Sequence, residues 1–431
     1  MQVTIHPTAQ LAGALAAHGS KNYTSRHILC ATLAHGVTEL TNPAVIDDAQ
    51  AMLACCQALG AQTTMTATGL RIVGTAGKLT APGELNVGNA GAVARFLMAI
   101  CAAIPAPTRF VTPYPDSLGR RPHLDLLTAL RELGCSSSSN AGRLPITISG
   151  GLEKGGVVHV SGATSSQFTS ALLFLAPLLR GTTHIIVTGE QRSAPLLDQT
   201  LRVLAATGIQ AEAAPDRREF IIHGPQEYQG GRHDIPGDWP GTAAILAAAA
   251  VTESKVTITG LYDDHQGEQA IVPVLQAMGC DIHFDASAHT VSVRGGAPLH
   301  AVEFDGDKAT DAVMAMVAAA CFAKGTSRFY NIENLRYKES DRISDYCAEL
   351  RKLGAQVEET RDSIIVHGQP NGLPGGATIE AHHDHRLLMG AAIASLRCRR
   401  PVVLNEAHHI SKSYPAFFQD LQKLGTRMEW A

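Results

Sequence analysis

The segment LRELG, at residues 130–134, is one of six similar segments along this chain. Each segment ends on a glycine after an apolar pattern, which is typical of the end of a helix. The glycines are Gly60, Gly134, Gly208, Gly279, Gly354 and Gly425, at successive separations of 74, 74, 71, 75 and 71 residues. This regular spacing indicates a tandem repeat of one long unit.

A hairpin-like stretch follows each of the first five glycines and closes on a second glycine. The second glycines are Gly74, Gly150, Gly224, Gly295 and Gly368. The sixth copy is cut short, because residues 426–431 have room for only one strand. Residues 2–7, QVTIHP, form an alternating strand pattern with no helix before it, so we expect the two chain ends to pair.

The 431-residue length suits two domains of about 200 residues each. Because the N-terminal strand belongs with the last three repeats, the chain must cross between the domains near residues 18–21 and 235–238. The sequence therefore predicts an α/β fold with two domains of three βαβαββ units each. Residues 20–236 form one domain, and residues 1–19 with 237–431 form the other.

Composition excludes several protein classes. Hydrophobic content of 45% with 17% charged residues is typical of a globular protein, and the net charge of −4 argues against a nucleic-acid or membrane surface. Nine cysteines without CxxC spacing indicate neither a disulfide framework nor a zinc site. No segment resembles a signal peptide or an apolar span of ~18 residues. We expect a cytoplasmic monomer.

A polar turn precedes the Ala-rich helix of every repeat. The six turns cover residues 19–26, 88–95, 164–168, 238–242, 307–311 and 383–386. Helix N-termini carry unsatisfied N–H groups and a partial positive charge of roughly +0.5. If several of these turns converge, they form a site for anions.

A second loop in several repeats, before the helix that ends on glycine, collects cations. It supplies Arg120, Arg121, Arg192, Ser193, Lys338, Glu339, Arg342 and Lys412. Arginine pairs with phosphate or carboxylate through two hydrogen bonds, and lysine adds a compact charge. The residues alone therefore predict small substrates rich in phosphate and carboxylate, held between two lobes that close.

Simpler interpretations apply to individual motifs. An isolated KESDR segment, residues 338–342, is more often a solvated helix start. The tract His382, His383, Asp384, His385 has metal-ligand chemistry, but Arg386 beside it would repel a cation, so we expect a helix start and no metal. His408 and His409 are expected on the surface. No Walker or Rossmann glycine motif indicates a nucleotide cofactor.

Nine motifs, in order, resemble the 5-enolpyruvylshikimate-3-phosphate (EPSP) synthase family over nearly the whole chain. They are GSK…R (19–26), GNAG…RFL (88–97), RRP (120–122), SSQF (165–168), SAP (193–195), the segment at Asp311, NLRYKESDR (334–342), DHR (384–386) and KSYP (412–415). The resemblance implies two lobes, each an inside-out α/β barrel of three units, that close over phosphoenolpyruvate and shikimate 3-phosphate.

The resemblance also assigns residues by position. The phosphoenolpyruvate site is expected at Lys21, Gly91, Arg121, Gln167, Arg342, Arg386 and Lys412. The acceptor site is expected at Asn22, Arg26, Ser165, Ser166, Gln167, Ser193, Asp311, Asn334 and Lys338. The catalytic residues are expected to be Asp311 as base, Glu339 as acid, and Lys338 and Lys21 beside them.

The family reaction adds the acceptor hydroxyl to C2 of phosphoenolpyruvate and then loses phosphate, without a metal or cofactor. This chain has Asn22, Leu196 and Ala92 where the family usually has Ser, Tyr and Thr. These differences leave open a related enolpyruvyl transferase that acts on another phosphorylated alcohol, such as a nucleoside monophosphate.

Three further alternatives are weaker. A UDP-N-acetylglucosamine enolpyruvyl transferase would carry a Cys in the loop at residues 112–122, which has none. An RNA 3'-phosphate cyclase is disfavoured by the acidic charge balance. A non-catalytic binding protein is disfavoured because Asp311, Glu339 and the matching cations are all present.

Overall fold

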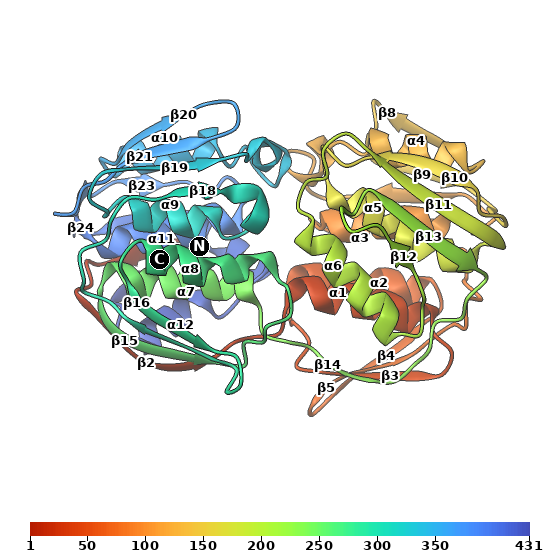
Figure 1. The fold of residues 1–431 in the computed structure, drawn as a ribbon, viewed down its shortest axis with the longest axis horizontal. Helices are drawn as coiled ribbons and strands as arrows, with labels where there is room; N and C mark the ends of the chain where they lie inside the picture. Colours follow the sequence, from red (N-terminus) through yellow and green to blue (C-terminus); the bar gives the residue numbers. More distant parts are fainter. The chain divides into compact units, whose positions relative to one another are not determined.

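The computed structural model describes residues 1–431, which divide into two compact units. Unit 1 comprises Met1–His18 and Pro236–Ala431, and unit 2 comprises Gly19–Ile235. Both units combine sheets with helices (Figure 1). None of the helices combines the length and the apolar character needed to cross a lipid bilayer.

Each unit contains three four-stranded sheets in which a parallel pair of strands is extended by an antiparallel pair. In the first sheet of unit 2 the strand order is β14 (Arg232–Asp234), β3 (Val37–Thr41), β5 (Gly69–Val73), β4 (Gln62–Thr66). In the second sheet it is β6 (Glu84–Asn86), β7 (Thr108–Val111), β9 (Arg143–Ser149), β8 (Ser136–Asn140). In the third sheet it is β10 (Val157–Ser161), β11 (Gly181–Thr188), β13 (Glu219–Gly224), β12 (Glu212–Ala213).

Unit 1 repeats the same topology three times and adds a small two-stranded sheet. The orders are β2 (Gln10–Ala16), β15 (Glu253–Thr259), β17 (Thr290–Arg294), β16 (Asp281–Asp285); β18 (Glu303–Asp305), β19 (Thr326–Tyr330), β21 (Ile364–His367), β20 (Gln356–Glu359); β23 (Thr378–Ile379), β25 (Val402–Leu404), β1 (Val3–Ile5), β26 (Met428–Trp430); and β22 (Leu373–Gly375) with β24 (Cys398–Arg400).

The two chain ends pair, as the truncated sixth repeat predicts. Strand β1 lies antiparallel to β26, with Val3 opposite Trp430, and on its other side it lies antiparallel to β25. Strand β14, from the end of unit 2, lies parallel to β3, and β2 lies parallel to β15. Each unit is thus completed by strands that are distant in the sequence.

The helices that follow the polar turns lie inside each unit. They are α1 (Lys21–Leu33), α3 (Gly91–Cys101) and α5 (Ser166–Leu175) in unit 2, and α7 (Trp239–Val251), α9 (Val313–Ala320) and α11 (His385–Leu396) in unit 1. Every residue of α7, α9 and α11 is buried. A helix that is apolar on all sides belongs in an interior, so the predicted inside-out α/β arrangement is confirmed.

The six repeated glycines end the second helix of each repeat. These helices are α2 (Asp47–Ala58), α4 (Leu124–Glu132), α6 (Pro195–Ala206), α8 (Ile271–Ala277), α10 (Ser344–Lys352) and α12 (Phe417–Lys423). All six glycines have positive φ, from 85° at Gly208 to 119° at Gly425. The next N–H then bonds back into the helix, as Cys135 N does to Leu130 O at 3.0 Å. Only glycine adopts this left-handed conformation without a steric cost.

The second glycine of each repeat has a different function, which is close packing. A Cβ atom at Gly74 would lie 2.2 Å from the Ala34 carbonyl oxygen, and one at Gly224 would lie 2.1 Å from that of Leu179. Both carbonyls follow the end of a central helix. The hairpin therefore meets the helix backbone so closely that a side chain does not fit.

Candidate active site

Five of the six predicted polar turns begin a central α-helix. In unit 2 the helices begin at Lys21, Gly91 and Ser166. In unit 1 the carboxylate of Asp238 accepts a hydrogen bond from Gly241 N at 2.7 Å at the start of α7. Asp384 accepts one from Arg386 N at 2.8 Å at the start of α11. These caps and open N–H groups favour negative charge at the turns.

The prediction that an α-helix starts at the fifth turn, residues 307–311, is wrong. Asp305 accepts a hydrogen bond from Asp307 N, and this bond begins a short 3₁₀ helix, η4 (Gly306–Ala309), instead. Helix α9 begins only at Val313. Asp311 therefore lies in the link between the two helices, where its side chain meets other loops of unit 1.

In unit 2, Arg121 and Gly91 lie together. Arg121 follows the 3₁₀ helix η1 (Leu118–Arg120) and is only 6% exposed. A Cβ atom at Gly91 would lie 2.6 Å from Arg121 Nη1 and 2.9 Å from Cζ. Glycine is therefore required for the guanidinium to lie over the first residue of α3. A buried cation beside a helix N-terminus is suited to an anionic ligand.

Arg95, on α3, positions two of the predicted residues. Its Nη1 donates to Gln167 Oε1 at 2.8 Å and to Ser165 Oγ at 3.2 Å, and its guanidinium carbon lies 4.8 Å from the Phe168 ring centroid. The arginine is 1% exposed. It therefore connects the start of α5 to α3, a role to which the sequence analysis assigned no residue.

His123 is a second buried residue near Arg121 that was not among the predicted site residues. It is fully buried, and that burial, together with the charges of Arg95 and Arg121, holds the pKa of its imidazole well below the usual range. The ring is therefore neutral at pH 7 and adds no positive charge to these two arginines. Only its burial identifies it, because a single His before a helix is not informative in a sequence.

The remaining predicted residues of unit 2 are divided among three positions. Ser166 is buried in the first turn of α5, and Ser193 is buried with a positive φ of 52° before α6. Lys21 Nζ lies 3.6 Å from Asp48 Oδ2. Asn22 follows Lys21 in the first turn of α1.

Arg26 has three internal hydrogen bonds. It donates to Thr200 Oγ1 at 2.9 Å and to the carbonyl oxygens of Asn22 and Leu196, both at 3.1 Å. Burial lowers the pKa of Arg26 to about 10, although tyrosine and cysteine neighbours oppose the change. An acceptor molecule would have to compete with these three bonds.

In unit 1, Arg342 connects three carboxylates. Its guanidinium donates to Asp384 and Glu339 at 2.8 Å and to Asp311 at 2.9 Å. Burial by itself would lower the pKa of Arg342, but the charges of Asp384, Glu339 and Asp311 outweigh it and raise the pKa. A cation paired this fully stays charged and fixes the positions of the surrounding acids.

Arg386 and Lys412 complete this cluster. Arg386 Nη2 lies 3.6 Å from Asp311 Oδ2, and Lys412 Nζ lies 3.5 Å from Glu339 Oε1. Arg386 is 2% exposed, yet its Nε and Nη2 atoms have no hydrogen-bond partner. Buried guanidinium donors are costly to leave unsatisfied, so this site is prepared for an additional anion.

Glu268 is the main residue of unit 1 that the sequence analysis missed. It lies in the 3₁₀ helix η3 (Gly267–Ala270), is 4% exposed, and accepts a hydrogen bond from Asp311 N at 3.2 Å. Burial, and then the charge of Asp311, raises its pKa to about 7. Its loop corresponds to the loops of Arg121 and Lys412 in other repeats, so the repeat alignment could have identified it.

Glu268→Gln should change how stability depends on pH. The pKa of Glu268 is higher in the folded state than in the unfolded state, so the folded protein binds this proton more tightly. The resulting contribution to stability is present below about pH 4 and is lost as pH rises toward 7. The stability of the variant relative to the parent protein should therefore increase by roughly 3 kcal/mol from pH 4 to pH 8. Urea unfolding across this range measures the difference. Parallel curves would contradict the prediction, and Glu303→Gln, an exposed change, is the control.

Asn334 and Lys338 belong to the loop between β19 and α10. Asn334 lies in the 3₁₀ helix η5 (Glu333–Tyr337), and its Nδ2 donates to Asp307 Oδ1 at 3.0 Å. Lys338 follows η5 and is half-buried. The loop that ends at Arg342 thus contacts the link that contains Asp311.

The histidine tract at residues 382–385 does not converge on one point. His382 bonds to Glu349 at 2.8 Å, Asp384 caps α11, and His385 is buried in its first turn. The expected helix start is therefore observed. His383 faces a different direction and lies beside His409, which is half-buried and not fully on the surface as expected.

Comparisons with known proteins identify the family of this chain. The family model described as EPSP synthase (3-phosphoshikimate 1-carboxyvinyltransferase) matches residues 5–421. A 3-phosphoshikimate 1-carboxyvinyltransferase of Deinococcus radiodurans is 48% identical over all of this chain and 97% of its own length. The chain belongs to the EPSP synthase family. The family predicted from the nine motifs is confirmed, and with it the assignment as a transferase.

Other similar proteins share less of the sequence. A relative of the same name from Methanocella arvoryzae is 36% identical over 97% of each chain. The EPSP synthase structure from Acinetobacter baumannii matches 100% of both chains with a TM-score of 0.81 at 24% identity. The enolpyruvyl transferase NikO from Streptomyces tendae matches 99% of this chain and 98% of its own, with a TM-score of 0.80 at 18% identity. At these identities the two structures establish the fold alone.

Proposed function

We propose that the protein transfers the enolpyruvyl (carboxyvinyl) group of phosphoenolpyruvate to the 5-hydroxyl of shikimate 3-phosphate and releases phosphate. One observation in unit 1 carries the proposal. Arg342, Arg386 and Lys412 lie against the carboxylates of Asp311 and Glu339, so fixed positive charge lies beside groups that can transfer protons. Membership of the EPSP synthase family supports the same reaction.

The donor is proposed to bind to cations and backbone N–H groups. The residues are Lys21, Gly91, Arg121 and Gln167 of unit 2, with Arg342, Arg386 and Lys412 of unit 1. Phosphoenolpyruvate carries a phosphate and a carboxylate, and charge-assisted hydrogen bonds to such groups are the strongest that side chains offer. The unsatisfied donors of Arg386 support its role in particular.

The acceptor is proposed to bind to hydroxyls, amides and two cations. The residues are Asn22, Arg26, Ser165, Ser166, Gln167, Ser193, Asp311, Asn334 and Lys338. The bonds that Arg95 makes to Ser165 and Gln167 support their joint placement.

In the proposed reaction Asp311 removes the proton of the 5-hydroxyl as its oxygen attacks C2 of phosphoenolpyruvate. Glu339 delivers a proton to C3, which gives a tetrahedral intermediate. Loss of a proton from C3 and departure of phosphate then form the enolpyruvyl product. Lys338 and Lys21 stabilise the developing charge, and no cofactor or metal takes part.

The identity of the acceptor depends on Asn22 and Leu196. Leu196 lies in the first turn of α6, and its carbonyl accepts from Arg26. An alternative acceptor, such as a nucleoside monophosphate, is not favoured, since the 48% and 36% identical relatives both carry the shikimate enzyme's name.

Phosphate release from phosphoenolpyruvate tests the proposal. We expect release that depends on shikimate 3-phosphate, and none with uridine monophosphate or without an acceptor. Equal release with and without shikimate 3-phosphate would overturn the assignment. Activity only with the nucleotide would select the alternative acceptor.

Arg121→Ala should raise the KM for phosphoenolpyruvate more than tenfold, because it removes charge-assisted bonds worth about 1.5–3 kcal/mol. Gly91→Ala should act in the same direction, since its Cβ atom displaces the Arg121 guanidinium. Arg120→Ala is the matched control, because Arg120 is the exposed neighbour. An unchanged KM in Arg121→Ala would remove this residue from the donor site.

Further proposals concern the domains, the oligomeric state and the cellular location of the protein. We propose two domains, residues 20–236 and residues 1–19 with 237–431, and the division into two compact units supports this. A monomeric state and a cytoplasmic location are further proposals that rest on composition. Size-exclusion chromatography with light scattering tests the first of these.

A further inference from the structure

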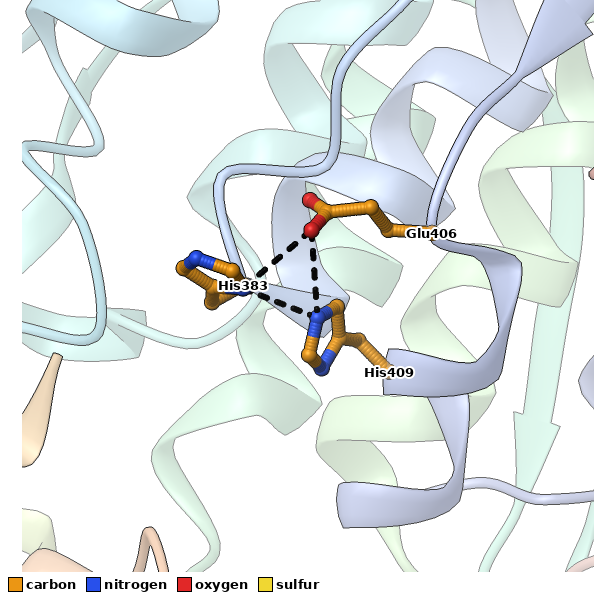
Figure 2. Close-up of side chains that lie close together, drawn as sticks. All are labelled: His383, Glu406 and His409. Atoms are coloured by element: carbon orange, nitrogen blue, oxygen red, sulfur yellow. Dashed lines mark hydrogen bonds and ion pairs between the residues drawn. The ribbon is translucent and has the colours of Figure 1, made fainter. Parts of the chain in front are cut away.

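Three side chains of unit 1, outside the cluster around Arg342, point toward one another. They are His383, in the turn before α11, Glu406, in the loop after β25, and His409, in the 3₁₀ helix η6 (Ala407–Lys412). Figure 2 shows the two imidazoles and the carboxylate around one point. Two imidazoles and one carboxylate form a common ligand set for zinc in proteins.

The distances between the donor atoms fit a tetrahedral metal ion. His383 Nδ1 lies 3.0 Å from His409 Nε2 and 3.3 Å from Glu406 Oε1, and the last two atoms are 3.7 Å apart. Zinc–ligand bonds of about 2.0–2.1 Å in a tetrahedron require donor atoms about 3.3–3.4 Å apart. An octahedral ion with similar bonds would require about 2.9–3.0 Å. The observed set is closer to the tetrahedron.

The backbone conformation agrees with this geometry. His383 and Glu406 have positive φ values of 57° and 55°. Left-handed backbone is uncommon outside glycine, and two of the three donors adopt it.

The positive charge of Arg386 does not prevent cation binding here. Its guanidinium is directed to Asp311, 3.6 Å away, and to Met389 Sδ at 3.7 Å. The sequence argument against a metal concerned the tract 382–385, which does not form a site. The site uses only His383 of that tract, with two residues more than twenty positions further along the chain.

We propose that His383, Glu406 and His409 bind one zinc-class divalent ion whose fourth position is open to water. The ion would connect the turn before α11 to η6. Because Arg386 lies in the first turn of α11 and Lys412 ends η6, this connection would hold together the two segments that carry them. The proposal does not depend on the substrate of the enzyme.

Metal titration of the full-length protein after removal of bound metal tests the site. Zinc should bind with a stoichiometry of one and raise the Tm, and cobalt(II) should give the intense visible absorption of a tetrahedral complex. His409→Ala should weaken zinc binding by more than about 100-fold, because it removes a ligand. Even a residue that only hydrogen-bonds to a ligand changes metal affinity by about 10–100-fold. His408→Ala, the exposed neighbour, is the matched control and should bind as the parent protein does.

Glu406→Gln provides a second variant with unchanged shape, in case His409→Ala does not fold. It should also weaken zinc binding and remove the tetrahedral cobalt spectrum. No saturable binding, an octahedral cobalt spectrum, or equal binding by the parent protein and Glu406→Gln would overturn the proposal. The three side chains would then be a hydrogen-bonded group only.

Discussion

Asp311→Asn should lower kcat by about 10²–10⁴-fold, the usual contribution of a positioned general base. The amide retains the size of the side chain but cannot accept the proton of the acceptor hydroxyl. Because Arg342 would keep Glu339 and Asp384 as partners, the fold should persist. Steady-state phosphate release and near-ultraviolet circular dichroism measure the two effects separately.

The control for Asp311→Asn is Glu303→Gln, on the exposed face of β18 before the same loop. This variant should retain full activity. An Asp311→Asn enzyme with kcat within threefold of the parent would exclude Asp311 as the base. If its kcat is unchanged and only the KM for the acceptor increases, the residue binds substrate without transferring the proton.

Arg342→Met should lower the free energy of unfolding by about 3–5 kcal/mol. The substitution leaves Asp384 and Glu339, both buried, without the guanidinium that pairs with them at 2.8 Å. An intact buried ionic cluster contributes little net stability, but removal of one partner is strongly destabilising. The remaining charges are then buried away from water without an opposite charge to compensate them. Urea unfolding at pH 7 measures the change.

Arg361→Met provides the comparison for this variant. Arg361 also pairs with a carboxylate, that of Glu333 at 2.8 Å, but its side chain is 81% exposed. Water solvates both partners when the pair is broken, so stability should be unchanged. Equal effects of the two substitutions would show that burial of the Arg342 cluster has no energetic consequence.

Local signals in the sequence predicted the fold class well. Each repeated glycine, such as Gly134, ends a helix because a left-handed residue is needed there, and this requirement involves only the neighbouring backbone. The pairing of β1 with β26 followed from a strand missing in the last repeat. The order of the nine motifs predicted the family, which the comparisons confirm.

Parts of the candidate site could not be predicted from local patterns. Asp311 was expected at an α-helix start, but the side chain of Asp305 begins a 3₁₀ helix first. Glu268 and His123 acquire shifted pKa values from burial and from charged neighbours.

The sequence by itself determined the repeat, the helix ends, the Ala-rich helices and the family, because each depends on short-range backbone preferences or on residue order. Only the tertiary structure decided that Arg342 pairs with three carboxylates and that His383 meets Glu406 and His409. Such contacts depend on the packing of loops that are distant in the sequence. Electrostatic energy varies steeply with distance and burial, and neither quantity is set by residue order alone.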